Sequence, residues 1–151
     1  MQKYEDDVCL VDSGTTHTIL KYQKFFSTLE LNKQNVSTIA GSASIIEGSG
    51  RAHILLPNGT HLFIENALYS SNSRRNLLSF KDIRMNGYHI ETKNEGNKEL
   101  LCIISNVGSQ KLTLEQFSIL SMGLYHTRIG IVESHAIMSQ KLKDPTNLIL
   151  W

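Results

Sequence analysis

The chain has 151 residues, of which 40% are hydrophobic and 19% are charged. This length and composition are typical of one soluble globular domain, or of a small domain with an appendage, and they exclude a second large domain. A chain of this size buries about 68 to 70% of the surface that its unfolded form exposes, so its core needs neither disulfides nor a metal. The formal net charge is only +1, which argues against a basic face that neutralises many phosphates, so nucleic acid is not an expected partner.

The cysteines and the absence of long apolar runs bear on the compartment. Cys9 and Cys102 each lie inside an apolar run, where a small buried hydrophobe is commoner than a disulfide or a metal ligand. No stretch approaches the roughly 18 apolar residues of a membrane span. Residues 1–7 lack the apolar core of a signal peptide. We therefore expect a cytoplasmic protein in a reducing compartment, without a membrane partner.

Short strands and polar turns dominate the first fifty residues. Residues 8–11 predict a short buried strand that ends at Asp12-Ser13-Gly14. Residues 32–37 are polar and predict a connection between elements. Residues 38–50 are rich in Gly and Ser, which predicts a flexible hairpin or a mobile loop.

The clearest local signal is a hairpin in the middle of the chain. Two apolar runs, 52–56 and 61–64, flank Pro57-Asn58-Gly59-Thr60. Asn-Gly is the preferred pair for a type I′ turn, in which both central residues have positive φ. Residues 67–69 then continue the β character.

One helix and further strands follow this hairpin. Apolar residues at 77, 78, 80 and 83 have nearly helical spacing, and Asn86-Gly87 is a suitable end for a short helix. Residues 88–92 and 100–105 predict strands on either side of a charged turn, 93–98. Many short strands with a single helix predict an all-β fold, a barrel or a sandwich, whose core spans residue 8 to about residue 92.

One segment has the residues that aspartic proteases use, Val11-Asp12-Ser13-Gly14-Thr15. That chemistry needs a carboxylate at a rigid turn, a following hydroxyl that fixes the turn, and a Gly that lets backbone amides approach the carboxylate. Asp-Ser-Gly is also common as a plain turn between two strands. The triplet by itself therefore leaves both interpretations open.

Two further segments favour the protease interpretation. An aspartic protease needs a glycine-rich flap over its extended substrate, and residues 38–50 supply one with Gly41, Gly48 and Gly50. It also needs an apolar segment followed by a short helix behind the catalytic turn, which residues 67–84 supply.

Together these motifs resemble, in order and spacing, the protease region of copia-type retrotransposon Pol polyproteins. The resemblance covers nearly the whole chain. The motifs are Leu10-Val11-Asp12-Ser13-Gly14-Thr15-Thr16, Glu47-Gly48-Ser49-Gly50-Arg51-Ala52, Leu56-Pro57-Asn58-Gly59, Ala67-Leu68-Tyr69-Ser70, Arg75-Asn76-Leu77-Leu78-Ser79-Phe80 and Gly87-Tyr88-His89-Ile90.

The resemblance implies a retropepsin-like closed β-barrel with one short helix in residues 1–92. Asn76, Leu77, Leu78 and Ser79 match the stretch that precedes the single helix of retroviral proteases and supports their site from behind. A Gly usually stands where this chain has Ser79, and His17 lies one place earlier than the His of copia-type sequences. Residues 93–151 are expected to form a β-rich connector toward a zinc-binding pre-integrase region that is not present in this chain.

The implied reaction determines the expected partners. Peptide hydrolysis by this route needs two carboxylates about 3 Å apart that share one proton and titrate as a pair. The chain has five Asp residues, and only Asp12 has the Ser-Gly context. The second carboxylate is therefore expected to be Asp12 of another copy, so the prediction is a homodimeric aspartic endopeptidase without a cofactor, acting on its own polyprotein in the cytoplasm, virus-like particles included.

Two other functions compete with this hypothesis. The first is a non-catalytic β-barrel that serves as a structural or interaction module of a transposon remnant. The second is a nucleic-acid-binding accessory segment, against which the even charge distribution argues, since the net charge is −2, +2 and +1 in residues 1–50, 51–100 and 101–151. A metal site is not expected, because the six His and two Cys lack zinc-ligand spacing.

Overall fold

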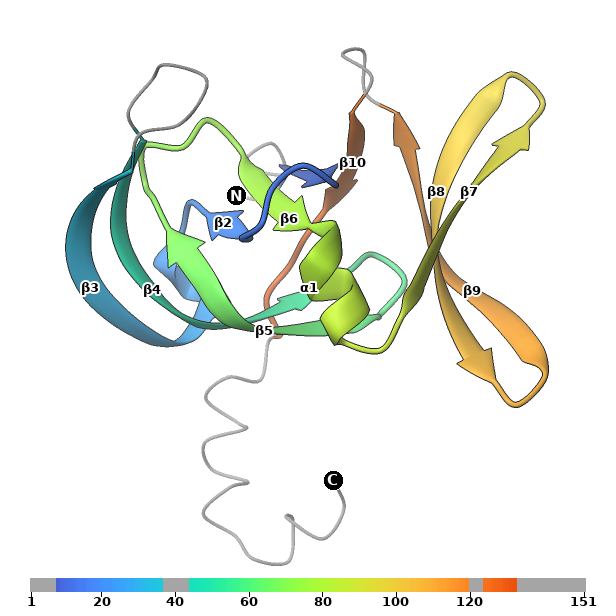
Figure 1. The fold of residues 1–151 in the computed structure, drawn as a ribbon, viewed down its shortest axis with the longest axis horizontal. Coiled ribbons are helices and arrows are strands. Elements are labelled where there is room, and N and C mark those ends of the chain that lie inside the picture. The colour runs from blue at the N-terminus through green and yellow to red at the C-terminus, as the bar shows by residue number, and fades with distance from the viewer. Residues whose placement is uncertain (1–7, 37–43, 120–123, 133–151) are drawn as a thin grey trace, which may run out of the picture.

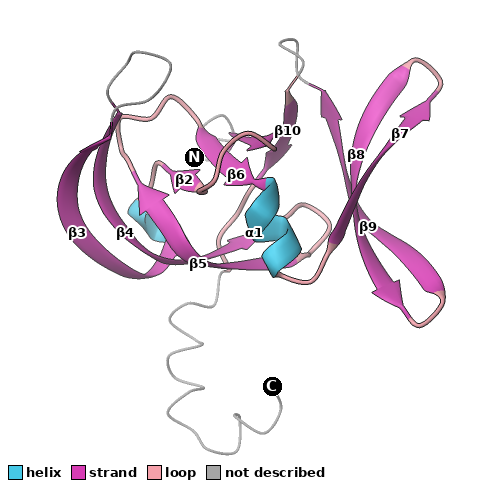
Figure 2. Ribbon diagram, in the orientation of Figure 1, coloured by secondary structure: helices cyan, strands magenta, loops and turns pink. Residues whose placement is uncertain are grey.

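The structure is a computed structural model that describes residues 8–36, 44–119 and 124–132. Most of these residues lie in strands, with one short α-helix and one 3-10 turn (Figure 2). The predicted all-β class with a single short helix is therefore confirmed. The elements are β1 (Val8–Asp12), β2 (Ile19–Leu20), η2 (Gln23–Phe25), β3 (Phe26–Val36), β4 (Ser44–Leu55), β5 (His61–Tyr69), β6 (Asn76–Ser79), α1 (Phe80–Met85), β7 (His89–Glu95), β8 (Lys98–Val107), β9 (Gln110–Ile119) and β10 (Tyr125–Arg128).

All ten described strands belong to one sheet with the order β3-β4-β5-β2-β6-β1-β10-β9-β8-β7. The pairs β1–β6 and β2–β5 are parallel, and the other pairs are antiparallel. Beyond β10, the backbones of Leu55 and Gly130 exchange two hydrogen bonds of 2.8 Å each. The sheet thus curls until the chain after β10 returns to β4, while β7, β8 and β9 extend to one side (Figure 1).

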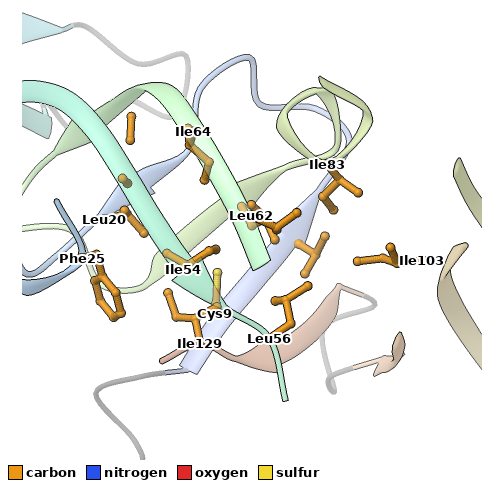
Figure 3. Packing of buried hydrophobic residues seen from close by; sticks show 14 of the residues in the cluster. Cys9, Leu20, Phe25, Ile54, Leu56, Leu62, Ile64, Ile83, Ile103 and Ile129 are labelled. Carbon is orange, nitrogen blue, oxygen red and sulfur yellow. The ribbon is translucent and has the colours of Figure 1, made fainter. Parts of the chain in front are cut away.

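The buried core draws side chains from both halves of the chain. Ile103 and Ile129 lie in the same apolar cluster as Leu56 (Figure 3). The domain boundary predicted between residues 92 and 93 falls inside β7. In the described part of the chain, the residues beyond that boundary continue the same sheet and the same core. No described helix is long and apolar enough to cross a membrane.

The predicted central hairpin is present, but its turn differs from the predicted type. The Gly59 amide donates to the Leu56 carbonyl at 2.9 Å, so Pro57 and Asn58 are the central residues of the turn. Within this turn only Gly59 has a positive φ, +96°, and every described residue with a positive φ is a Gly. This is the pattern of a three-residue hairpin loop, a turn followed by a left-handed Gly. The type I′ prediction was wrong because Pro57 fixes a negative φ at the first central position.

Strand β9 holds this turn through a buried carboxylate. Glu115 is only 1% exposed. Its oxygens accept hydrogen bonds from the amides of Asn58, at 3.0 Å, and Thr60, at 3.2 Å. The Asn58 side chain in turn donates to the Leu114 carbonyl at 3.0 Å. A hairpin of the first half of the chain is therefore completed by residues of the second half.

Three other predicted elements are corrected by the structure. The predicted connection at residues 32–37 lies in strand β3 as far as Val36, and the helix expected from residue 77 begins only at Phe80. Within the predicted flexible segment 38–50, residues 44–50 belong to β4, which pairs with β3 on one side and β5 on the other. The remainder of that segment, including Gly41, lies outside the described residues.

The glycines of β4 serve close packing rather than freedom of the backbone. A Cβ atom at Gly50 would lie 2.0 Å from the Thr28 carbonyl oxygen, and one at Gly48 would lie 2.6 Å from that of Glu30. Both oxygens are backbone atoms of β3, so they cannot rotate away. The sequence predicted glycine here for mobility, whereas the structure requires it because two strands approach closely.

Gly50→Ala is expected to destabilise the fold by at least about 2 kcal/mol, since overpacking against backbone typically costs 1 to 3 kcal/mol or more. Urea unfolding monitored by circular dichroism measures this difference. Ser49→Ala is the matched control, because Ser49 is an exposed neighbour on the same strand. Equal unfolding midpoints for the two variants would contradict the close approach of β3 and β4.

Candidate active site

The candidate site lies where β1 ends beside β6. These strands are parallel, and Asp12 lies opposite Ser79 in their register. Asn76, at the start of β6, is fully buried. Its side chain donates to the Val8 carbonyl at 3.2 Å and accepts from the Lys21 amide at 2.9 Å. Asn76 therefore connects the beginning of β1 to the residue that follows β2.

Asp12 presents its carboxylate from the end of β1. The Gly14 amide donates to Asp12 Oδ1 at 2.8 Å. A Cβ atom at Gly14 would lie 3.3 Å from the same oxygen, which is tighter than most real contacts, so Gly favours this close approach. Asp12 is half-buried, and Ser13 and Gly14 are exposed. The site thus contains an oriented carboxylate that is open on one side.

The residues after the turn are held by side-chain hydrogen bonds. The Thr15 hydroxyl donates to the His17 carbonyl at 2.9 Å, while the Thr16 hydroxyl lies 3.1 Å from His17 Nδ1. The Ser79 hydroxyl donates to the Thr15 carbonyl at 2.9 Å. A Gly at position 79 could not supply this bond, so the departure of Ser79 from the retroviral pattern has a structural use.

Two residues at this site were not singled out by the sequence. The Thr18 hydroxyl donates to Asp82 Oδ2 at 2.6 Å and accepts from the Ser79 amide at 3.1 Å. No local pattern links Thr18 to Asp82, because Thr18 lies in the loop before β2 and Asp82 lies in α1, 64 positions along the chain. One usable signal exists: Ser79 and Asp82 have the S-x-x-D spacing of a helix start, and Ser79 does accept from the Lys81 amide as the N-cap of α1.

The predicted site residues separate into two groups in the structure. Asp12, Thr15 and Ser79 are brought together at the end of β1, with Leu78 buried directly before Ser79. Gly48 and Gly50 instead pair with β3 and β5. The long hairpin of β3 and β4 is the element on which a flap would be built, and its outermost residues lie outside the described part of the chain.

In the described part of the chain, the cysteines and the possible metal ligands do not form a second site. Cys9 and Cys102 are free and buried. Burial raises the pKa of the Cys9 thiol far above its usual range, so it is not a thiolate nucleophile. No cluster of three or more metal-ligating side chains occurs among the described residues. A cleft of about 280 Å³ beside the loop is lined in part by His17, Phe63 and Met85.

Comparison with known proteins agrees with this β-rich arrangement. A family model described as "Pol polyprotein, beta-barrel domain" matches residues 9–88, which is more than half of the chain. The matched range contains the Asp12 turn, β6 and α1. No curated protein and no solved structure matches the chain. The chain therefore belongs to the family of Pol polyprotein beta-barrel domains.

Proposed function

We propose that this domain is the aspartic endopeptidase of a copia-type retrotransposon Pol polyprotein, with a retropepsin-like fold. The observation that supports the proposal is the position of Asp12. Its carboxylate stands at the end of a strand, accepts the Gly14 amide at 2.8 Å and remains half-exposed. A plain turn between two strands would also place Asp12 at the end of a strand. It would not need the buried hydroxyl groups of Thr18 and Ser79 that hold the loop after Asp12.

The proposed reaction uses two Asp12 carboxylates, one from each of two copies. The ionised carboxylate takes a proton from water as the water oxygen bonds to the peptide carbonyl carbon, and the protonated one gives its proton to the carbonyl oxygen. These steps form a tetrahedral intermediate. Its collapse reforms the carbonyl, breaks the C–N bond and transfers a proton to the leaving amine. Ser13 and Gly14 are exposed beside Asp12, which leaves the loop accessible to a second copy. No cofactor takes part.

The partners follow from this mechanism. The substrate is a peptide segment of the polyprotein, and the second partner is an identical chain related by a two-fold axis, the commonest symmetry of soluble oligomers. The hairpin of β3 and β4 is the proposed flap. The proposed location is the cytoplasm, virus-like particles included.

The shared dyad makes activity depend on association. We expect cleavage of a peptide substrate per chain to rise with protein concentration until the dimer saturates. At saturation, a ninefold excess of Asp12→Asn chain is expected to lower wild-type cleavage about tenfold by mass action, because hybrid dimers contain one carboxylate. Sedimentation velocity at the same concentrations supplies the oligomeric state.

Two outcomes oppose the proposal. An active species that stays monomeric at every concentration would exclude the shared dyad. A wild-type chain that cleaves nothing, including its own longer precursor, would favour the non-catalytic structural or interaction module instead.

A further inference from the structure

The Thr18 hydroxyl occupies a buried position between helix α1 and the loop that follows Asp12. Thr18 is 0% exposed. A hydroxyl has one proton, and that of Thr18 goes to Asp82 Oδ2 at 2.6 Å. A lone pair of the same oxygen accepts the Ser79 amide at 3.1 Å. Asp82 thus fixes the rotation of the hydroxyl, and this rotation leaves a lone pair that accepts a hydrogen bond from the buried Ser79 amide.

Ser79 holds the loop at two points. Its amide donates to Thr18 at one end, and its hydroxyl donates to the Thr15 carbonyl at the other, at 2.9 Å. Ser79 is also 0% exposed, and the Lys81 amide donates to its hydroxyl at 3.1 Å. Because Ser79 lies opposite Asp12 in the parallel pair of β1 and β6, the loop is held by the same strands that present the carboxylate.

We infer that Thr18 and Asp82 are positioning residues for Asp12, acting through Ser79. This inference rests on the proposed function. The dyad requires two carboxylates about 3 Å apart, so a small movement of the loop separates them, and a misplacement of 1 Å can lower a rate about 100-fold. The network therefore sets the rate of the chemical step rather than the binding of the peptide.

Thr18→Val tests the inference by removing the hydroxyl while keeping the shape of the side chain. We expect kcat to fall about 10- to 100-fold with KM changed less than about threefold. Asp82→Ala is expected to have a similar effect. The conservative variants Thr18→Ser and Asp82→Asn, which keep a hydroxyl and an acceptor oxygen, are expected to recover kcat to within about threefold. Because both residues act through the same hydrogen-bond path, the double variant Thr18→Val with Asp82→Ala should lower kcat little more than either substitution alone.

Thr127→Val is the matched control. Thr127 is also a buried Thr, 7% exposed, but its hydroxyl donates only to the neighbouring Arg128 carbonyl among the described residues. It should keep the kcat of the parent, and the urea unfolding of every variant shows which of them fold. If Thr18→Val does not fold, Asp82→Ala carries the test, since Asp82 is only half-buried.

A second readout does not require activity. Amide hydrogen exchange at Ser79 and Gly14 is expected to accelerate at least tenfold in Thr18→Val and Asp82→Ala, while exchange at Ile64 in β5 stays constant. A folded Thr18→Val chain with parent kcat and parent exchange would overturn the inference. A wild-type chain that cleaves no better than Asp12→Asn would overturn the proposed function, and accelerated exchange would then show that the network holds the loop without serving catalysis.

Discussion

Asp12→Asn in a longer precursor is expected to abolish self-cleavage while the domain keeps its fold. The amide has nearly the shape of the carboxylate, but it can neither take the proton of water nor share one. Loss of a positioned acid or base lowers rates by about 10²- to 10⁴-fold. The amide oxygen can still accept the Gly14 amide that Asp12 Oδ1 accepts at 2.8 Å. Immunoblotting of the precursor and thermal unfolding of the domain measure the two effects separately.

Asp12→Ala separates catalysis from the turn. It also removes the acceptor for the Gly14 amide, so it should lose both cleavage and about 1 kcal/mol of stability. The Asn variant should instead dimerise at least as well as the parent, because two carboxylates repel unless a proton lies between them. Parent-rate cleavage by Asp12→Asn would refute the assignment of this residue as catalytic.

A chain truncated after residue 92 is expected not to fold. It lacks Leu101, Ile103, Phe117 and Ile129, which are all at most 2% exposed in the core. Each fully buried apolar side chain contributes about 1.5 to 3 kcal/mol, so four contribute about 6 to 12 kcal/mol. That is comparable to the whole stability of a typical domain, about 5 to 15 kcal/mol. Circular dichroism and amide proton dispersion in NMR spectra measure the result.

A chain truncated after residue 132 is the control. It keeps every described strand, so it should unfold cooperatively like the full chain. The shorter chain also loses Glu115, and with it the acceptor for the amides of Asn58 and Thr60. A cooperative unfolding transition in residues 1–92 alone would show that the family range of residues 9–88 is an independent unit.

The sequence predicted those parts of the fold that depend on local patterns. The central hairpin, the helix end at Asn86-Gly87 and the strand before Asp12 each have turn residues next to apolar runs. Strand β3 was missed because it is an edge strand. Its exposed polar residues, such as Asn32, interrupt the alternation of polar and apolar residues by which a half-buried strand is recognised. The pairing of β1 with β10 joins distant segments, and no local signal specifies such a register.

In the candidate site, too, the residues that belong to short sequence motifs were predicted, and those linked only by the fold were not. Asp12 and Ser79 were found because each belongs to a short motif. Thr18 and Asp82 were missed because a hydrogen bond between residues 64 apart depends on the completed fold. Gly48 and Gly50 were found for the wrong reason, since composition does not distinguish a glycine needed for mobility from one needed for close approach.

The pairing of β1 with β10 also determines where the chain enters and leaves the domain. Val8 lies opposite Arg128 in antiparallel register, so the first described strand begins beside the end of the last. Domains with neighbouring ends are readily inserted into longer chains. In a polyprotein, the chain would enter β1 and leave β10 at the same end of two paired strands in the middle of the sheet. The two junctions would be neighbours in space although nearly the whole domain separates them in sequence.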